Sequence, residues 1–336
     1  MKKNKIINYI GLIIITGIVL YFSLRKDFDR IISEIIHINP LFLLLGLFLV
    51  FSYWFFRAVV LRNFVLKFKP NFRLFDAFRV HMSTIFFDQV TPFASGGQPY
   101  EIYKLTKEEK LPVSSSTNIV FQTFIVYQIA FLFISLLAFL YNTIFRIYPV
   151  NPLLRGLVTL GFIVNFVVGL VMFSVAFLEK FNNFLINLGI KILFKFKIIK
   201  DKKAQEEKWH QSTKNFHDSA SYLLKDKKNF INCILLNVLS IIALYLVPIA
   251  IFYGIGSGGN ITGIETIVTA AYVSMMGSFI PLPGGTGGLE YGFLVFFGCF
   301  ILEPKLTAAM IIWRFATYYI GIVVGAIFIN IRKKEY

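Results

Sequence analysis

The chain has 336 residues, of which 57% are hydrophobic, 17% are aromatic and only 15% are charged. A soluble domain carries about 25% charged residues, so this composition excludes an ordinary soluble protein and predicts a polytopic membrane protein. The net charge of +16 would suit nucleic acid, but the basic residues lie in loops beside apolar segments, where they mark the cytoplasmic side of a membrane. We therefore expect membrane phospholipid as the partner, and no nucleic acid.

Six uninterrupted apolar runs are each long enough to cross a bilayer as a helix. The first follows the basic start MKKNK and has no small-residue cleavage site, so it is an uncleaved span rather than a signal peptide. The six runs cover residues 6–24, 39–61, 117–141, 156–178, 229–253 and 306–330. They predict an all-α membrane protein with about six transmembrane helices.

Lysine and arginine are distributed unevenly between the loops. Residues 62–80, the 179–228 stretch with its twelve lysines and six acidic residues, and the RKK at 332–334 are basic. In contrast, residues 142–155 and 254–263 carry few basic residues. This asymmetry places both termini and the 179–228 loop on the cytoplasmic side of the membrane.

Two further stretches, 72–105 and 264–302, are apolar but broken by glycine and proline. In the expected orientation, the span at 229–253 ends outside and the span at 306–330 begins outside. The chain between them therefore returns to the face it left, which predicts a re-entrant hairpin with PLPGGTGG at its tip.

Residues 72–105 begin and end on the cytoplasmic side, with their break at TPFASGGQP. One alternative is a second re-entrant hairpin, which enters from the cytoplasm. The other is a helix lying on the cytoplasmic surface, because the apolar residues before the break form one face. The sequence leaves both open.

The two halves match in the order and length of their apolar segments at one constant offset, which places residue 117 on residue 306 and Glu101 on Glu290. Because the broken stretches enter from opposite sides, we predict an inverted-topology repeat. The single membrane domain, residues 1–336, then consists of a first span at 6–24, repeat one at 39–141, a linking span at 156–178, the basic loop at 179–228 and repeat two at 228–330.

Broken helices in a bilayer leave backbone N–H and C=O groups without partners, which is tolerated only where they are buried or line a wet cavity. Opposed tips would meet near the midplane, where free N–H groups attract an anion such as phosphate. Arg314, in the middle of its span, needs Glu290, Glu101 or a bound phosphate as partner. The predicted substrate-binding residues are Gly96, Gly97, Gln98, Glu101, Pro283, Gly284, Gly285, Gly287, Gly288, Glu290 and Arg314.

Other polar residues give weaker signals. Arg57 lies near the cytoplasmic end of its span, and we expect its side chain to reach the membrane interface. Asp88 and Gln89 lie beside the first break, and the sequence does not decide between a structural and a functional role for them. Cys233 and Cys299 suggest neither a disulfide nor a metal site. We expect no catalytic residue, no metal and no cofactor, since no nucleotide-binding motif or catalytic triad is recognisable.

Three segments carry a resemblance to a known family: TPFASGGQPYEIYKL at 91–105, PLPGGTGGLE at 281–290 and WRFATYYIGIVVG at 313–325. They resemble, in this order, the flippase-like membrane region of lysylphosphatidylglycerol synthase, the multiple-peptide-resistance factor. The resemblance covers essentially the whole chain and implies a domain that moves lipid between leaflets. Gln98 departs from the family, which often has glutamate there, and this leaves Glu101 as the nearest carboxylate.

In the full-length synthases a separate soluble domain makes lysylphosphatidylglycerol. Because the chain ends at Tyr336, soon after the last span, we expect that domain to be absent and the chain not to be an enzyme by itself. The resemblance implies movement of an anionic or aminoacylated phospholipid, or of a polyprenyl-phosphate-linked lipid. The alternatives are a membrane component of lysylphosphatidylglycerol synthesis, or a scaffold for a soluble lipid-modifying enzyme. A homo-oligomer is compatible with either.

Overall fold

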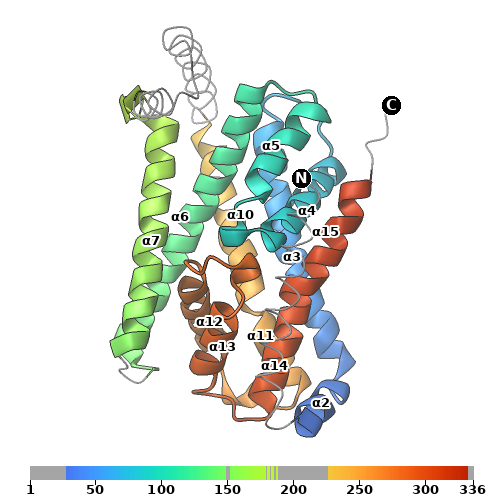
Figure 1. Cartoon of the computed structure of the whole chain (residues 1–336), viewed down its shortest axis with the longest axis vertical. Coiled ribbons are helices and arrows are strands. Elements are labelled where there is room, and N and C mark those ends of the chain that lie inside the picture. The colour runs from blue at the N-terminus through green and yellow to red at the C-terminus, as the bar shows by residue number, and fades with distance from the viewer. Residues whose placement is uncertain are drawn as a thin grey trace, which may run out of the picture.

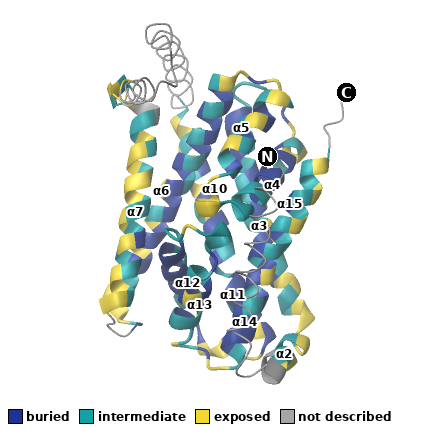
Figure 2. Ribbon diagram, viewed as in Figure 1, coloured by how far each residue is buried: buried dark blue, intermediate teal, exposed yellow. Residues whose placement is uncertain are grey.

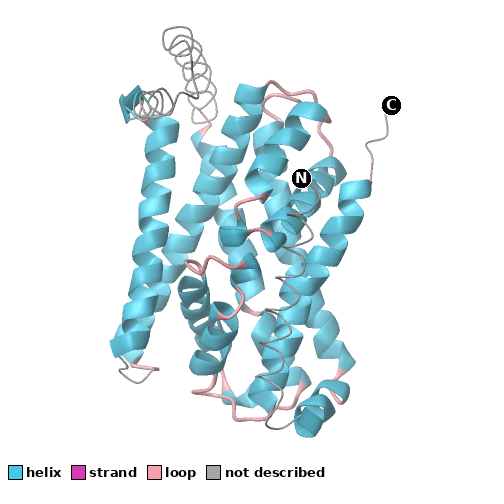
Figure 3. Ribbon diagram, in the orientation of Figure 1, coloured by secondary structure: helices cyan, strands magenta, loops and turns pink. Residues whose placement is uncertain are grey.

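A computed structural model describes residues 28–148, 152–178 and 226–331, with a few isolated positions between 180 and 187. Every regular element in these ranges is a helix (Figure 3), which confirms the predicted all-α membrane architecture. The helical stretches there that are long and apolar enough to cross a membrane are Pro40–Val65, Val113–Phe145, Pro152–Val175, Lys227–Gly254 and Lys305–Asn330. They match five of the predicted spans. The expected first span at 6–24, most of the 179–228 loop and both termini lie outside the described residues.

The first spanning helix shows how local sequence sets a helix start. Asn39 precedes α3 (Pro40–Val65), and its side chain accepts a 3.0 Å hydrogen bond from the backbone N–H of Leu41. Proline suits the first turn because its missing N–H would have no partner there. Three of the described spans are single helices without an internal break, namely α3, α6 (Val113–Phe145) and α7 (Pro152–Phe177).

Two other spans are not single regular helices. The fourth divides at Leu246 into α10 (Lys227–Tyr245) and α11 (Val247–Gly254), because Pro248 supplies no N–H to continue the ladder. The last span contains a π-helical stretch, Phe315–Tyr319, between α14 (Lys305–Arg314) and α15 (Ile320–Asn330). Such stretches are rare and frequently mark functional positions.

Each broken stretch folds as helix, turn and helix. In 72–105 these are α4 (Leu74–Val90), the 3₁₀ turn Pro92–Ala94 and α5 (Gly97–Lys107). In 264–302 they are α12 (Gly263–Gly277), the 3₁₀ turn Pro283–Gly285 and α13 (Gly288–Phe297). Figure 1 shows α4 and α5 in the upper half of the bundle and α12 and α13 in the lower half, and the two turns pack against each other between them.

The α4 helix is enclosed by other helices. All residues from Arg79 to Ile85 are buried, and seven consecutive residues cover every side of a helix. A helix lying on a membrane surface would keep one face exposed. The packing partners of α4 are α3, α5 and α15. The central part of α4 is therefore packed among other helices.

The outer surface of the bundle is apolar. Large side chains on α7 stay exposed at helical spacing (Figure 2), namely Leu160, Ile163, Phe166, Leu170 and Phe173. An apolar stripe of this length suits lipid rather than water. The inner face of α7 carries Gly161, where a Cβ would lie 1.9 Å from the carbonyl oxygen of Met275, so only glycine allows α7 to pack this closely on α12.

Several loops that the charge pattern assigns to the cytoplasm meet at one end of the bundle. Arg79 is 1% exposed and pairs with Glu108 and with Glu109, the latter at 3.0 Å. Lys69 pairs with Glu109 at 2.7 Å, and Arg79 also donates to the carbonyl of Ile331 at 3.4 Å. This buried network fastens α4 to the segment between α5 and α6 and to the end of α15.

The start of α10 is fastened at the same end. Asp226 accepts a 3.0 Å hydrogen bond from the backbone N–H of Asn229 and forms an ion pair with Lys67, which follows α3. The hydrogen bond from Lys67 lowers the pKa of Asp226. Both contacts favour the ionised carboxylate, so the end of α3 and the start of α10 stay joined near neutral pH.

Candidate functional site

The two 3₁₀ turns have the same backbone conformation. Phe93 in the first turn has φ 55° and ψ 20°, and Gly284 in the second has φ 61° and ψ 17°. Ser95 and Thr286, which stand at equivalent places after these two residues, each donate a side-chain hydrogen bond to the proline carbonyl three residues earlier, at 2.9 and 2.7 Å. The two turns therefore share both their backbone conformation and one side-chain hydrogen bond.

The register between the halves is therefore not constant. The helices before the breaks, α4 and α12, begin at positions that correspond in the register that the sequence pattern predicts. That register would place Phe93 on Leu282, whereas the turn geometry matches Phe93 with Gly284. The difference arises because the connection between α12 and its turn is longer than the connection between α4 and its turn. In the register of the turns Glu101 corresponds to Gly292, so the predicted pairing of the two glutamates does not follow it.

Arg314 lies against the second turn. Its Nε is 2.7 Å from Glu290 Oε1, and its Nη2 donates to the carbonyl of Gly284 at 3.1 Å and to the Thr286 hydroxyl at 3.4 Å. Glu290 also accepts a 2.7 Å hydrogen bond from the N–H of Gly287. Arg314 and Glu290 are 5% and 6% exposed. Each thus compensates the charge of the other in a region where a lone charge would be expensive.

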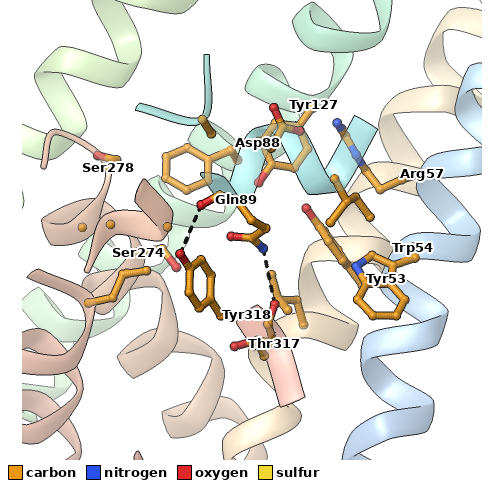
Figure 4. Close-up of a pocket in the computed structure, with 18 of the residues that line it drawn as sticks. Tyr53, Trp54, Arg57, Asp88, Gln89, Tyr127, Ser274, Ser278, Thr317 and Tyr318 are labelled. Atoms are coloured by element: carbon orange, nitrogen blue, oxygen red, sulfur yellow. Dashed lines mark hydrogen bonds between the residues drawn. The ribbon is translucent and has the colours of Figure 1, made fainter. Parts of the chain in front are cut away.

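Tyr318 joins the two halves. Its ring lies 4.5 Å from the Arg314 guanidinium, and its hydroxyl donates to the backbone carbonyl of Gln89 at 3.1 Å. The Gln89 side chain in turn donates to the carbonyl of Thr317 at 3.5 Å. Figure 4 shows both hydrogen bonds between the end of α4 and the π-helical stretch. The two breaks are therefore linked directly.

A cavity of about 450 Å³ lies beside these contacts, and helices of both halves form its walls. On the side of the second half, Ser274, Ser278, Gly284, Arg314 and Tyr318 line it. The opposite wall is formed mainly by aromatic and ionisable side chains from α3 to α6, namely Tyr53, Trp54, Arg57, His81, Asp88, Gln98, Glu101 and Tyr127. Figure 4 shows the labelled members of both groups converging on one space.

Arg57 does not reach the membrane interface as the sequence position suggested. Its Nη1 donates to Asn237 Oδ1 at 3.0 Å, and its guanidinium lies 4.2 Å from the centre of the Tyr127 ring. Because Asn237 and Tyr127 belong to α10 and α6, they hold the side chain inside the bundle. Arg57 is therefore part of the cavity wall.

The structure divides the predicted substrate-binding residues into two groups. Gln98, Glu101, Gly284, Gly285 and Arg314 line the cavity. The others lie next to it and build the turns and helix starts that surround it. This second group consists of Gly96, Gly97, Pro283, Gly287, Gly288 and Glu290.

The glycines that start α5 and α13 act through packing. A Cβ on Gly97 would lie 2.0 Å from Asp88 Oδ1, the atom that accepts a 3.0 Å hydrogen bond from the Gly97 N–H. A Cβ on Gly288 would lie 2.4 Å from Ile280. Both glycines bring a helix start close to the segment before it, so the two arms of each helix pair are tightly joined.

Several lining residues were not singled out from the sequence, among them Tyr53, Trp54, His81, Tyr127 and Tyr318. The sequence does contain a pattern from which some of these lining residues could have been found. His81, Thr84 and Asp88 recur every three to four residues, which places them on one face of α4. Polar residues on one face of an apolar helix indicate a polar interior, but the sequence does not show which helix faces them.

The described residues contain no group of three or more histidine, cysteine, aspartate or glutamate side chains arranged to hold a metal ion. The cavity instead combines guanidinium groups, carboxylates and aromatic rings. These groups suit a charged organic ligand, which requires oriented donors and acceptors with apolar surroundings.

Comparison with known proteins bears on this site. No curated protein matches the chain. A family model described as the lysylphosphatidylglycerol synthase TM region matches residues 8–325, which include both turns, Arg314 and every cavity-lining residue. The chain therefore belongs to the lysylphosphatidylglycerol synthase TM region family.

Proposed function

We propose that the chain moves a phospholipid, or a polyprenyl-phosphate-linked lipid, between the two leaflets of a membrane. The observation that carries the proposal is the meeting of two broken helix pairs, with the same turn geometry, at a cavity inside an apolar bundle that charged and aromatic side chains help to line. A lipid headgroup crossing a bilayer needs such a path, because a charged group in hydrocarbon is strongly unfavourable.

In this proposal, Arg314 binds the phosphate of the headgroup. The contacts to Glu290 and Gly284 use Nε and Nη2, and Nη1 would donate to a phosphate oxygen. Arginine suits this role because its planar guanidinium presents several donors to phosphate oxygens at once. The acyl or prenyl tails would remain among the exposed apolar side chains of the outer surface.

We further propose that 39–141 and 228–330 form the inverted repeat, and that α4–α5 and α12–α13 are re-entrant hairpins entering from the cytoplasm and from outside. The common turn conformation and the opposite positions of the two pairs in the bundle support this (Figure 1). One repeat would rock against the other and so open the cavity first to one leaflet and then to the opposite leaflet. The termini would then be cytoplasmic, in an inner membrane.

A second candidate function is a membrane component of lysylphosphatidylglycerol synthesis, which the description of the family favours. In that role the cavity would hold phosphatidylglycerol or its lysylated product. A soluble lipid-modifying enzyme would be the partner, recruited through the basic 179–228 loop, and the chain would form a homo-oligomer or a complex with it.

Reconstitution separates the two candidates. Purified protein in liposomes that contain a trace of fluorescent phosphatidylglycerol should make the inner-leaflet fluorophore accessible to an impermeant quencher, whereas protein-free liposomes should not. Fluorescent phosphatidylcholine in parallel liposomes reports the headgroup preference. If accessibility stays at the protein-free level for every lipid offered, including a lysylated phosphatidylglycerol and a polyprenyl phosphate, translocation is wrong and the synthesis role is favoured.

A further inference from the structure

Among the described residues in and beside the cavity, carboxyl groups outnumber guanidinium groups. Arg314 and Glu290 compensate each other at 2.7 Å. Two further carboxyl groups, those of Asp88 and Glu101, line the wall across the cavity, and the one guanidinium on that wall belongs to Arg57. A region with two carboxylates and one fixed positive charge favours the uptake of a further cation.

Glu101 carries a buried carboxyl oxygen in this wall that lacks a hydrogen-bond partner among the described residues. Its side chain is 5% exposed, and its Oε1 is buried without a hydrogen bond from any described residue. Ionised carboxylates in such places are strongly unfavourable, because the water they lose is not replaced by donors. The geometry therefore favours a carboxyl group that carries a proton.

Asp88 is connected to the helix of Glu101 through the start of α5. Asp88 Oδ1 accepts a 3.0 Å hydrogen bond from the N–H of Gly97. Glu101 follows Gly97 by four residues, which places its side chain on the same face of α5, one turn further along. Two carboxyl groups in this arrangement disfavour double ionisation, so a proton on one is stabilised by the charge of the other.

Arg57 does not neutralise either carboxyl group by direct pairing. Its guanidinium is engaged by Asn237 and lies over the ring of Tyr127, and within the described residues it forms no ion pair with Asp88 or Glu101. The other ionisable or hydrogen-bonding groups of this wall come from four helices, namely Tyr53 and Trp54 of α3, His81, Thr84 and Gln89 of α4, Gln98 of α5, and Thr123 and Tyr127 of α6. His81 Nε2 is also buried without a described partner.

We propose that Asp88 and Glu101 form a binding site for one exchangeable proton, reached from the cavity. The proton adds to a carboxylate oxygen and leaves from it, so no other bond forms or breaks. If the proposed lipid movement is correct, this site would couple a proton to it, because the site and Arg314 line the same cavity. Only this coupling rests on the proposed function.

Thermal unfolding in detergent tests the site without any lipid assay. A proton held by the folded protein and released on unfolding makes stability fall as pH rises. For one proton and a chain of this size, Tm should fall by about 2 °C per pH unit. The measurement compares the wild type with Glu101→Gln between pH 5 and pH 9 in sodium-free buffer. The neutral glutamine removes one exchangeable proton, so its Tm should fall less steeply by that amount.

Glu34→Gln on α2 (Phe28–Ile36) is the matched control, because Glu34 lies outside the cavity wall, and it should follow the wild type. If Glu101→Gln does not fold, Asp88→Asn supplies the comparison, since an asparagine oxygen can still accept from Gly97. Superimposable Tm curves for the wild type and the folded variant would overturn the proton site. A sodium-dependent rise in wild-type Tm with no pH dependence would also overturn it.

The liposome assay then separates this proposal from the proposed function. A difference between the wild type and Glu101→Gln in the Tm curves, without lipid movement by either, would support the proton site and refute translocation. Lipid movement by the wild type with superimposable Tm curves would refute the site and leave translocation intact. If both hold, a pH gradient should change the initial rate of lipid movement several-fold in the wild type and leave the Glu101→Gln rate unchanged.

Discussion

The Tyr318 hydroxyl donates a 3.1 Å hydrogen bond to the backbone carbonyl of Gln89, at the C-terminal end of α4. The last four carbonyls of a helix have no partner within that helix, so Tyr318 satisfies one of them from the other half of the molecule. The Tyr318 ring also lies against Gly284, where a Cβ would be 2.0 Å from Cε2. One side chain therefore contacts both breaks.

Replacing Tyr318 with phenylalanine should remove this bond and keep the ring in place. We expect a loss of about 1 kcal/mol in the free energy of unfolding, because a partly buried carbonyl loses its partner. Lipid movement in liposomes should slow several-fold, since the two turns would no longer be held together. Tyr319→Phe is the matched control and should stay within about 0.5 kcal/mol of the wild type. Equal effects of the two variants would contradict the assigned role.

Replacing Arg314 with glutamine should abolish lipid movement and also destabilise the protein. Glu290 would remain buried without its positive partner, and breaking a buried pair in this way costs about 3–5 kcal/mol. The double variant Arg314→Gln, Glu290→Gln should regain most of that stability, because neither charge remains.

The double variant should still fail to move lipid, because no guanidinium remains for the phosphate. Chemical unfolding in detergent measures the change in stability, and the liposome assay, normalised to folded protein, measures lipid movement. Recovery of lipid movement in the double variant would show that Arg314 serves the structure alone.

A side chain at Gly284 should displace the second turn. Its φ of 61° disfavours residues with a Cβ, and the added atom would collide with the Tyr318 ring. We expect Gly284→Ala to cost at least about 1 kcal/mol in unfolding free energy and to slow lipid movement. Gly259→Ala is the control, because nothing lies within 4 Å of a Cβ there and its φ is not in the left-handed region. Wild-type rates in Gly284→Ala would exclude the turn from the lipid path.

The proposed orientation can be tested by labelling single cysteines in intact cells, after Cys233 and Cys299 are replaced with serine. A cysteine at Gly259 should react with a membrane-impermeant maleimide added outside, because this open loop carries few basic residues. A cysteine at the exposed Asn330 should react only after the cells are permeabilised. The reverse pattern would invert the topology and the assignment of both hairpins.

The apolar runs by themselves determined where the long helices lie. Runs of about 20 apolar residues without charge have few other structures available to them in a membrane, because every backbone group needs a partner. Glycine and proline likewise determined the position of both breaks, because proline ends a helical ladder and glycine allows positive φ. The need of Arg314 for a buried partner, and Glu290 as a candidate, also followed from the sequence.

The register between the halves required the structure. Phe93 and Gly284 adopt the same left-handed conformation, although phenylalanine is a residue that sequence reasoning does not place there. Hydrogen bonds within the turn accompany that conformation, because the N–H and the hydroxyl of Ser95 both donate to the carbonyl of Pro92. The two turns correspond in a register different from that of the helices before them. A sequence comparison that counts matching residue types cannot detect such a shift.

The cavity wall also depended on tertiary structure. Arg57 could have reached the interface along its own helix, but Asn237 of α10 and Tyr127 of α6 hold it inside. Asp88 and Glu101 line the same cavity, and the N–H of Gly97 binds Asp88 at the start of the helix that carries Glu101. Local sequence sets the helix and the face on which each side chain lies. Which faces meet is decided by packing between segments distant in sequence, and those contacts leave no periodic signal in a single chain.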